Sequence, residues 1–383
     1  MYAMKINQNF FLRIGTFVGA TLVFIGALYY ANNDFTTEEF NDQSFHETAR
    51  VTRILEDNTS LTEGGIVFGE MEVELEILTG PHRGSVRQST YFLNQMANAH
   101  LEVGDRVSVR FSIFSDGEIG SFQIEGLERR EMVLAFFLVF LVILGLMGGK
   151  RGMMAIAGLA FTLISIIFLL IPLMLKGYPV ILTTFLILTF VTIVSLIFLC
   201  GITVKSISAM LGCLVGVGAT AVLTHIAGSL TNISGFNMED VGMILSTTDF
   251  PQTEAAGLFI SGVLIASLGA VMDTAVTIAS TIEELKIANP NLSVGKLFRA
   301  GMNVGKDTMG TMSTTLILAF AGGSLNMMIL IYSQETSFNQ LINSDFIVAE
   351  IIRSIAGSLG IILTIPAVAA ISSMATPPST PSI

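Results

Sequence analysis

Two carboxylates are candidates for chemistry because they lie in or beside long apolar segments. Asp273 falls within the apolar run 256–281, and Asp307 stands just before the run 308–332, directly after Lys306. A carboxylate at membrane depth costs about 2.5–3.5 kcal/mol on insertion scales, so it is expected to face a protein interior or a water-filled cavity. Acids in such positions are typical of ion and substrate paths.

Small, hydroxylated and charged side chains recur at helical spacing in three of the apolar runs. Intervals of three and four residues place each set on one helix face. The residues that could line a polar path are Asp273, Thr277, Asp307, Thr311, Thr315, Asn326, Glu350 and Arg353. The same faces carry Gly262, Ala266, Gly269, Gly322, Gly357, Gly360 and Thr364.

A second interpretation of these stripes is helix packing. Small residues let membrane helices approach closely, and hydroxyl groups bond across such contacts. Packing would explain the small residues but not the acids. Glu350 and Arg353, three residues apart, could also pair with each other on one helix.

The acidic segment 232–255 offers weak candidates for a metal site, with His225 close in sequence. Carboxylate oxygens suit Ca²⁺ or Mg²⁺, but the spacing is not that of an EF-hand. A solvated acidic loop is the favoured interpretation, and no metal or other cofactor is expected. The four acids are Glu239, Asp240, Asp249 and Glu254.

Motifs of known enzymes are not found in the sequence. The segment Gly301–Asp307 differs from a Walker A loop in its spacing and its last residue, and there is no nucleophile elbow. Asp273 and Asp307 could form a carboxylate pair on neighbouring helices, but neither carries the motif of an intramembrane protease. We therefore expect that the protein is not an enzyme.

The composition places these residues in a membrane protein. Hydrophobic residues make up 52% of the 383 residues and charged residues only 13%, against about 25% charged in soluble domains. A soluble enzyme, a disordered chain and a nucleic-acid-binding protein are excluded. A membrane helix needs about 20 apolar residues, and eight runs are candidates: 10–30, 132–149, 152–175, 180–200, 207–231, 256–281, 308–332 and 347–371.

The lysines and arginines of the short loops predict the orientation. The first run follows Lys5 and is interpreted as an uncleaved signal anchor. With the N-terminus inside, eight helices place both termini in the cytoplasm, and only Arg129 and Arg130 depart from the rule. The inner segments then hold Lys5, Lys150, Arg151, Lys205, Lys286, Lys296, Arg299 and Lys306.

The segment between the first two runs is expected to form an extracytoplasmic β domain. Residues 32–131 contain 19 acidic residues and 8 arginines, so the net charge of −11 belongs to this segment. Acids and apolar residues alternate over 70–77, and polar and apolar residues over 106–113, which predicts strands with one buried face. Turn residues separate the strands, and we expect a small OB-like barrel. Its acidity argues against binding nucleic acid.

Four parts are predicted: a signal-anchor helix at 1–31, the acidic β domain at 32–130, a seven-helix membrane domain at 131–372 and a disordered cytoplasmic tail at 373–383. Within the inner loop, residues 293–299 are predicted to form a short amphipathic helix on the inner leaflet.

Three motifs resemble the YibE/F family of bacterial membrane proteins. They are Asp-Phe-Pro-Gln-Thr-Glu-Ala-Ala-Gly at 249–257, Gly-Ala-Val-Met-Asp at 269–273 and Gly-Met-Asn-Val-Gly-Lys-Asp-Thr-Met-Gly at 301–310. The similarity extends over about residues 50–371. It implies a multi-span domain in the bacterial cell membrane, behind an extracytoplasmic segment, and assigns no activity.

Two functions remain open. The first is a secondary transporter or exporter of a cation or small polar solute, with the path on the last three helices. The second is a non-transporting envelope scaffold whose outer domain binds a protein partner. The acid stripes favour the first, and the share of packing residues favours the second.

Overall fold

The structure is a computed structural model that describes residues 24–33, 43–62, 65, 67–94, 99–113, 119–233, 239–248, 250–334 and 337–375. It divides into two compact units, which are described separately. One comprises residues 35–143, and the other comprises residues 1–34 and 144–383. Most of the predicted signal anchor (residues 1–23) and the end of the predicted tail (376–383) lie outside the described residues.

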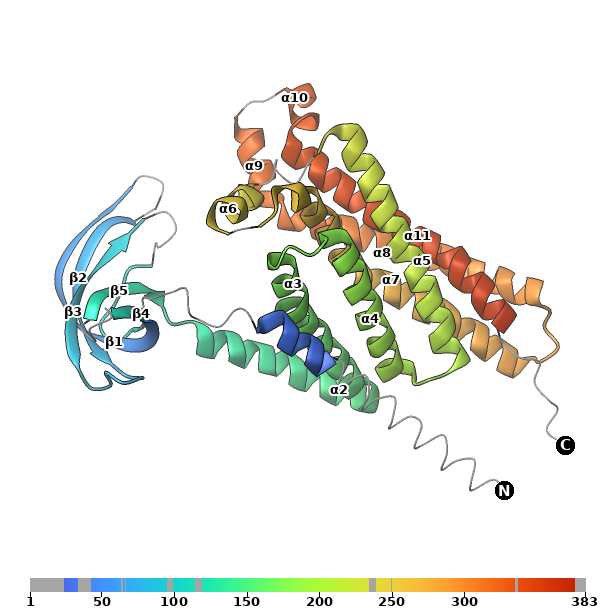
Figure 1. Cartoon of the computed structure of the whole chain (residues 1–383), viewed down its shortest axis with the longest axis horizontal. Helices are drawn as coiled ribbons and strands as arrows, with labels where there is room; N and C mark the ends of the chain where they lie inside the picture. The colour runs from blue at the N-terminus through green and yellow to red at the C-terminus, as the bar shows by residue number, and fades with distance from the viewer. Residues whose placement is uncertain are drawn as a thin grey trace, which may run out of the picture. The chain divides into compact units, whose positions relative to one another are not determined.

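The first unit is built around a five-stranded antiparallel sheet with the order β3-β2-β1-β4-β5 (Figure 1). The predicted alternating segments 70–77 and 106–113 lie in β2 and β4. The strands are β1 (Gln43–Leu61), β2 (Val67–Ile77), β3 (Val86–Leu93), β4 (Arg106–Ile113) and β5 (Ile119–Leu127).

The long first strand makes the sheet curl into a nearly closed barrel. β1 pairs with β4 along its first half and with β2 along its second half, and its register with β2 shifts twice, after Val51 and after Ile54. Such bulges bend a strand and increase its twist. At the seam between β3 and β5, the Ser89 hydroxyl donates to the Phe122 carbonyl over 3.4 Å.

Alternate residues of the strands fill the interior of this barrel. Val73, Leu75, Val109 and Phe111 are fully buried, in keeping with the period of two that predicted the strands. Leu101, from the connection between β3 and β4, is also fully buried. The unit therefore has its own apolar core.

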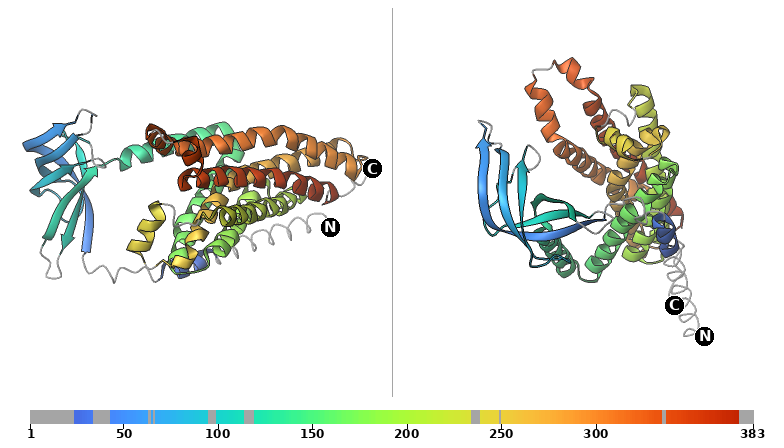
Figure 2. Two further views of the ribbon diagram at one scale, coloured as in Figure 1. Left: turned by 90° about the horizontal axis from the view of Figure 1, so that it is seen from above. Right: turned by 60° about the vertical axis from the view of Figure 1, so that its left-hand side comes forward.

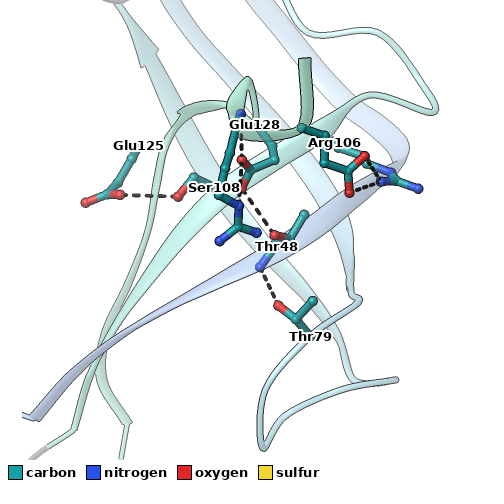
Figure 3. Close-up of polar contacts among 8 residues, drawn as sticks. Thr48, Thr79, Arg106, Ser108, Glu125 and Glu128 are labelled. Carbon is teal, nitrogen blue, oxygen red and sulfur yellow. Dashed lines mark hydrogen bonds and ion pairs between the residues drawn. The ribbon is translucent and has the colours of Figure 1, made fainter. Parts of the chain in front are cut away.

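A polar junction joins the end of β5 to the first turn of helix α2 (Arg130–Ser165) (Figure 3). Arg106 donates to both carboxylate oxygens of Glu131 at 2.8 Å. Glu128 accepts from the Thr48 hydroxyl at 3.2 Å and from the Arg130 amide at 3.0 Å. Its own amide donates to the Arg106 carbonyl. The strand therefore passes into the helix through a fixed connection of two residues.

Five helical stretches among the described residues are long and apolar enough to cross a membrane, or six if a bent pair counts as one span. The second unit contains, after α2, the π-helix η1 (Ile166–Leu170), α3 (Ile171–Leu175), α4 (Val180–Cys200), α5 (Val204–Thr231), α6 (Glu239–Thr247), η3 (Gln252–Glu254), α7 (Ala255–Ala288), α8 (Val294–Gly323), α9 (Leu325–Ser333), α10 (Phe338–Ile342) and α11 (Asp345–Ala375).

The longest stretch, Arg130–Leu175, reverses direction at Gly149. This residue has the non-helical angles φ 53° and ψ −131°. A Cβ atom on Gly152 would lie 2.3 Å from the Leu144 carbonyl oxygen, whereas residues eight apart in a straight helix are separated by about 12 Å. The runs 132–149 and 152–175 are therefore separate helical segments that contact each other at the turn.

Two other boundaries differ from the sequence expectations. The predicted amphipathic helix at 293–299 is the continuous first part of α8. The predicted run 308–332 is broken after Gly323, where α8 and α9 meet at a bend of 58°. At the C-terminal end, α11 continues to Ala375, so the first three residues of the predicted tail, which was expected to begin at 373, are helical.

The helices α5, α7, α8 and α11 form the centre of the second unit (Figures 1 and 2). Helix α11 contacts the other three, α7 also contacts α5 and α8, and α4 packs on α5 and α7. The centre of this cluster is apolar and fully buried, with Cys213, Leu264, Val271, Ile278 and Ile361 among its residues.

Candidate functional site

Asp273 lies on an uncovered face of α7. The residues on either side of it along this face, Gly269 and Thr277, are also exposed, and so are Gly262 and Ala266. Among the residues that the structure describes, none would lie within 4 Å of a Cβ atom at Gly262 or Gly269. The opposite face of α7 is buried in the apolar core. The Asp273 stripe is therefore an exposed face of small residues that carries two polar side chains, Asp273 and Thr277.

The stripe on α8 is also exposed but is less continuous than the sequence suggests. Asp307, Thr311 and Thr315 are exposed. The two threonine hydroxyls donate to carbonyls of their own helix, at 2.9 and 2.8 Å. Asn326 is exposed as well, but it lies beyond the bend, on α9. The spacing predicted that Asn326 lies on the same face as Asp307, but this prediction assumed a straight helix.

The stripe on α11 is divided between a packing contact and an ion pair. Its small residues are buried: Gly360 and Thr364 pack closely against α5, whereas Gly357 packs against Leu316 of α8 and Ser267 of α7. A Cβ atom on Gly216 would lie 1.9 Å from the Thr364 hydroxyl, and one on Gly360 would lie 1.8 Å from the Thr220 hydroxyl. Packing is therefore the correct interpretation for Gly357, Gly360 and Thr364.

Glu350 and Arg353 form an ion pair within α11, as their spacing allowed. The guanidinium donates to Glu350 over 2.5 Å, and both side chains are largely buried. The Arg353 guanidinium also lies 5.7 Å from the ring centre of Phe259 on α7 and 5.8 Å from that of Phe320 on α8. Cation–π contacts of this kind stabilise a partly desolvated arginine, so this pair ties three helices together.

Of the four candidate metal ligands, only Glu254 has its side chain among the described residues. Glu254 accepts a hydrogen bond of 2.9 Å from the Val180 amide, so its carboxylate caps the first turn of α4. Asp249 and the side chains of Glu239 and Asp240 lie outside the described residues. Among the residues that are described, no three His, Cys, Asp or Glu side chains are close enough to hold a metal ion.

A polar cluster that was not predicted from the sequence lies where the helical residues 24–32 meet the start of α4. The hydroxyls of Tyr30 and Tyr178 are hydrogen-bonded, and the Lys176 ammonium lies 4.7 Å from the ring centre of Tyr30. These residues line a cavity of 330 Å³. Tyrosine and lysine at the ends of apolar runs are typical of membrane interfaces. The positions of these three residues at the ends of the apolar runs could therefore have indicated the cluster.

A cavity beside His225 and a buried hydrogen bond between α4 and α7 also lacked a clear signal in the sequence. His225 lines a cavity of 380 Å³ at the end of α5, together with Asn232 and Phe259. The hydroxyls of Thr184 on α4 and Ser261 on α7 lie 2.7 Å apart and are buried. A threonine or serine in an apolar run does not reveal its partner, because it can equally bond to its own helix.

The fold and the stripes define a multi-pass α-helical membrane protein that carries a separate, barrel-like β unit. The family profile of YibE/F-like proteins matches residues 136–377, which is more than half of the chain. The chain therefore belongs to the YibE/F-like family, as its motifs indicated. No curated protein and no solved structure matches it.

Proposed function

We propose that the protein is a secondary transporter or exporter of a cation or small polar solute. The observation that carries the proposal is Asp273, an exposed carboxylate well inside a 34-residue helix whose opposite face is buried in an apolar core. An acid in this position is costly in a bilayer unless water or a partner reaches it. Thr277 on α7 and Asp307, Thr311 and Thr315 on α8 would extend the polar path.

The proposal includes the location and the topology. Eight helices would span the bacterial cell membrane, counting the N-terminal run, the two segments that meet at Gly149, and α8 with α9 as one span. Both termini would be cytoplasmic, and the β unit would be an extracytoplasmic OB-like domain. Neither catalysis nor a cofactor is part of the proposal, and the partners are the lipid bilayer and the transported solute.

The test compares Asp273→Asn with Glu284→Gln, an acid near the end of the same helix. Purified protein would be placed in proteoliposomes that contain a pH-sensitive dye, and flux would be measured with a series of monovalent cations, divalent cations and small polar solutes. We expect wild type and Glu284→Gln to show the same flux, and Asp273→Asn to lose it while assembling normally, since an amide has nearly the same shape.

A different result would favour another role. If Asp273→Asn lowered the melting temperature and left flux unchanged, Asp273 would be a structural acceptor. The second candidate, an envelope scaffold whose outer unit binds a protein partner, would then lead. The observation that favours this candidate is the row of acids along β2, where Glu72 lies directly opposite Glu56 of β1.

A further inference from the structure

The outer face of the sheet carries a row of acids along β2 that is balanced at one end only. Glu70, Glu72, Glu74 and Glu76 alternate with buried apolar residues. On β1, Arg53 lies directly opposite Glu74, and Arg50 lies directly opposite Glu76. Opposite charges at facing positions stabilise a sheet, so this half of the row faces complementary charge within the sheet.

At the other end of the row, the facing residues do not neutralise the acids. Glu56 lies directly opposite Glu72, and Asn58 lies opposite Glu70. On β3, the neighbours are Thr90 and Phe92. Like charges at facing positions destabilise a sheet. Glu74 and Glu76, two and four residues further along β2, each face an arginine, but Glu72 faces another acid. Such a local conflict is expected at a functional surface.

Two large apolar side chains lie exposed beside these acids. Phe92, directly across from Glu70, is 62% exposed, and Phe68, two residues before Glu70 on the same face, is 40% exposed. An aromatic face attracts a cation, and arginine or lysine stacks on such rings. We use the term acidic-aromatic face for Glu56, Phe68, Glu70, Glu72 and Phe92.

We infer that the acidic-aromatic face docks a basic segment of another protein. Lysine or arginine side chains would neutralise Glu56, Glu70 and Glu72, and their aliphatic stems would cover the two phenylalanine rings. Complementary charge gives such an interface its specificity and its fast association. This inference does not depend on the transport path, because no residue of α7 or α8 takes part in it.

The test measures binding to the full chain in nanodiscs of zwitterionic lipid. The probe is a short fluorescent peptide of lysine, glycine and serine, followed by anisotropy. We expect salt-sensitive binding, and an affinity about fivefold lower for Glu72→Gln, in line with the loss of one complementary charge. Phe92→Thr should weaken binding by a similar factor. Glu74→Gln is the matched control, because Glu74 faces Arg53 and accepts from the Thr52 hydroxyl; it should change the affinity by less than about twofold.

Stability separates docking from a purely structural role. Glu72→Gln removes the opposition to Glu56, so the β unit should melt no lower than wild type although it binds the peptide less well. Equal weakening by Glu72→Gln and Glu74→Gln would mean general attraction to an acidic domain and would overturn the inference. It would also be overturned if Ca²⁺ bound to wild type but not to Glu72→Gln while the peptide bound to neither.

Discussion

Charged side chains in the helical unit are accommodated in two different ways. Arg353 is paired with Glu350 and lies near two aromatic rings, although its buried Nε has no hydrogen-bond partner among the described residues; a buried charge depends on such a pair. Asp273 lies on an open stripe with two glycines and an alanine. Removing Glu350 should therefore harm folding, whereas removing the charge of Asp273 should harm function.

In the β unit, the titration of Tyr91 provides a prediction. Burial raises the pKa of Tyr91 above the ordinary 10.0 of tyrosine, and the charge of Arg129 opposes this shift. Both the folded and the unfolded chain keep the proton below pH 10. Above it, the unfolded chain loses the proton first, so the free energy of unfolding should fall as the pH rises.

The measurement is a spectrophotometric titration of a fragment with residues 32–130, in which Tyr91 is the only tyrosine. Phenolate absorbance should appear at a higher pH in the native fragment than in urea, and Tyr91→Phe should show no absorbance change. Identical curves in buffer and urea would mean that the fragment does not bury Tyr91 and does not fold alone.

At the scale of elements, glycines with the same helical spacing serve two purposes. On α5 and α11 they lie in a tight crossing, and on α7 they lie on an open surface. The spacing alone does not distinguish these cases, because both require small residues on one face.

Substituting one glycine of each kind should separate them. Gly216→Ala places a Cβ atom 1.9 Å from the Thr364 hydroxyl, so we expect a loss of about 1–3 kcal/mol from overpacking. Gly269→Ala meets nothing within 4 Å and should be neutral or slightly stabilising, since alanine favours helix. Melting of the detergent-solubilised protein, followed by size-exclusion chromatography, measures both. Equal losses would contradict the assignment of the α7 stripe as open.

Local sequence patterns predicted the positions of the helices and strands better than they predicted the contacts between them. The run 180–200 coincides with α4, and the alternation at 106–113 coincides with β4, because hydropathy and period depend on neighbouring residues. The run 256–281 missed the last turns of α7, where Glu283, Glu284 and Lys286 interrupt the apolar signal. The Glu350–Arg353 pair could be predicted because its two residues are neighbours on one helix. The Thr184–Ser261 bond and the α5–α11 crossing could not, because they join segments that are distant in the sequence.

The whole molecule divides its charge unevenly. The net charge of −11 belongs to the segment 32–131, and the rest is balanced. Arg129 and Arg130, which depart from the predicted orientation rule, lie at the polar junction, where Arg130 is 3.7 Å from Glu128. This ion pair offsets part of the charge of Arg130.

The topology can be tested with single cysteines at Ser60 and Asn291, both exposed, after replacement of Cys200 and Cys213. A membrane-impermeant maleimide added to intact cells should label the cysteine at 60 but not the cysteine at 291. Opened vesicles should label both, which controls for accessibility. Labelling of both from outside intact cells would contradict the eight-helix arrangement.

The divided pairing of β1 also has a consequence for the order of folding during synthesis. Residues 43–50 of β1 cannot pair until β4 has been made, more than fifty residues later in the chain. In contrast, β2 and β3 are close in sequence and can pair as soon as both have been made. Contacts that close long loops form slowly. The barrel therefore cannot be completed before β4 and β5 have been made, and by then α2 follows within two residues. The sheet therefore closes only when its last strand is already continuous with a helix that is long and apolar enough to cross a membrane, and until then β1 has an unpaired edge that other chains can approach.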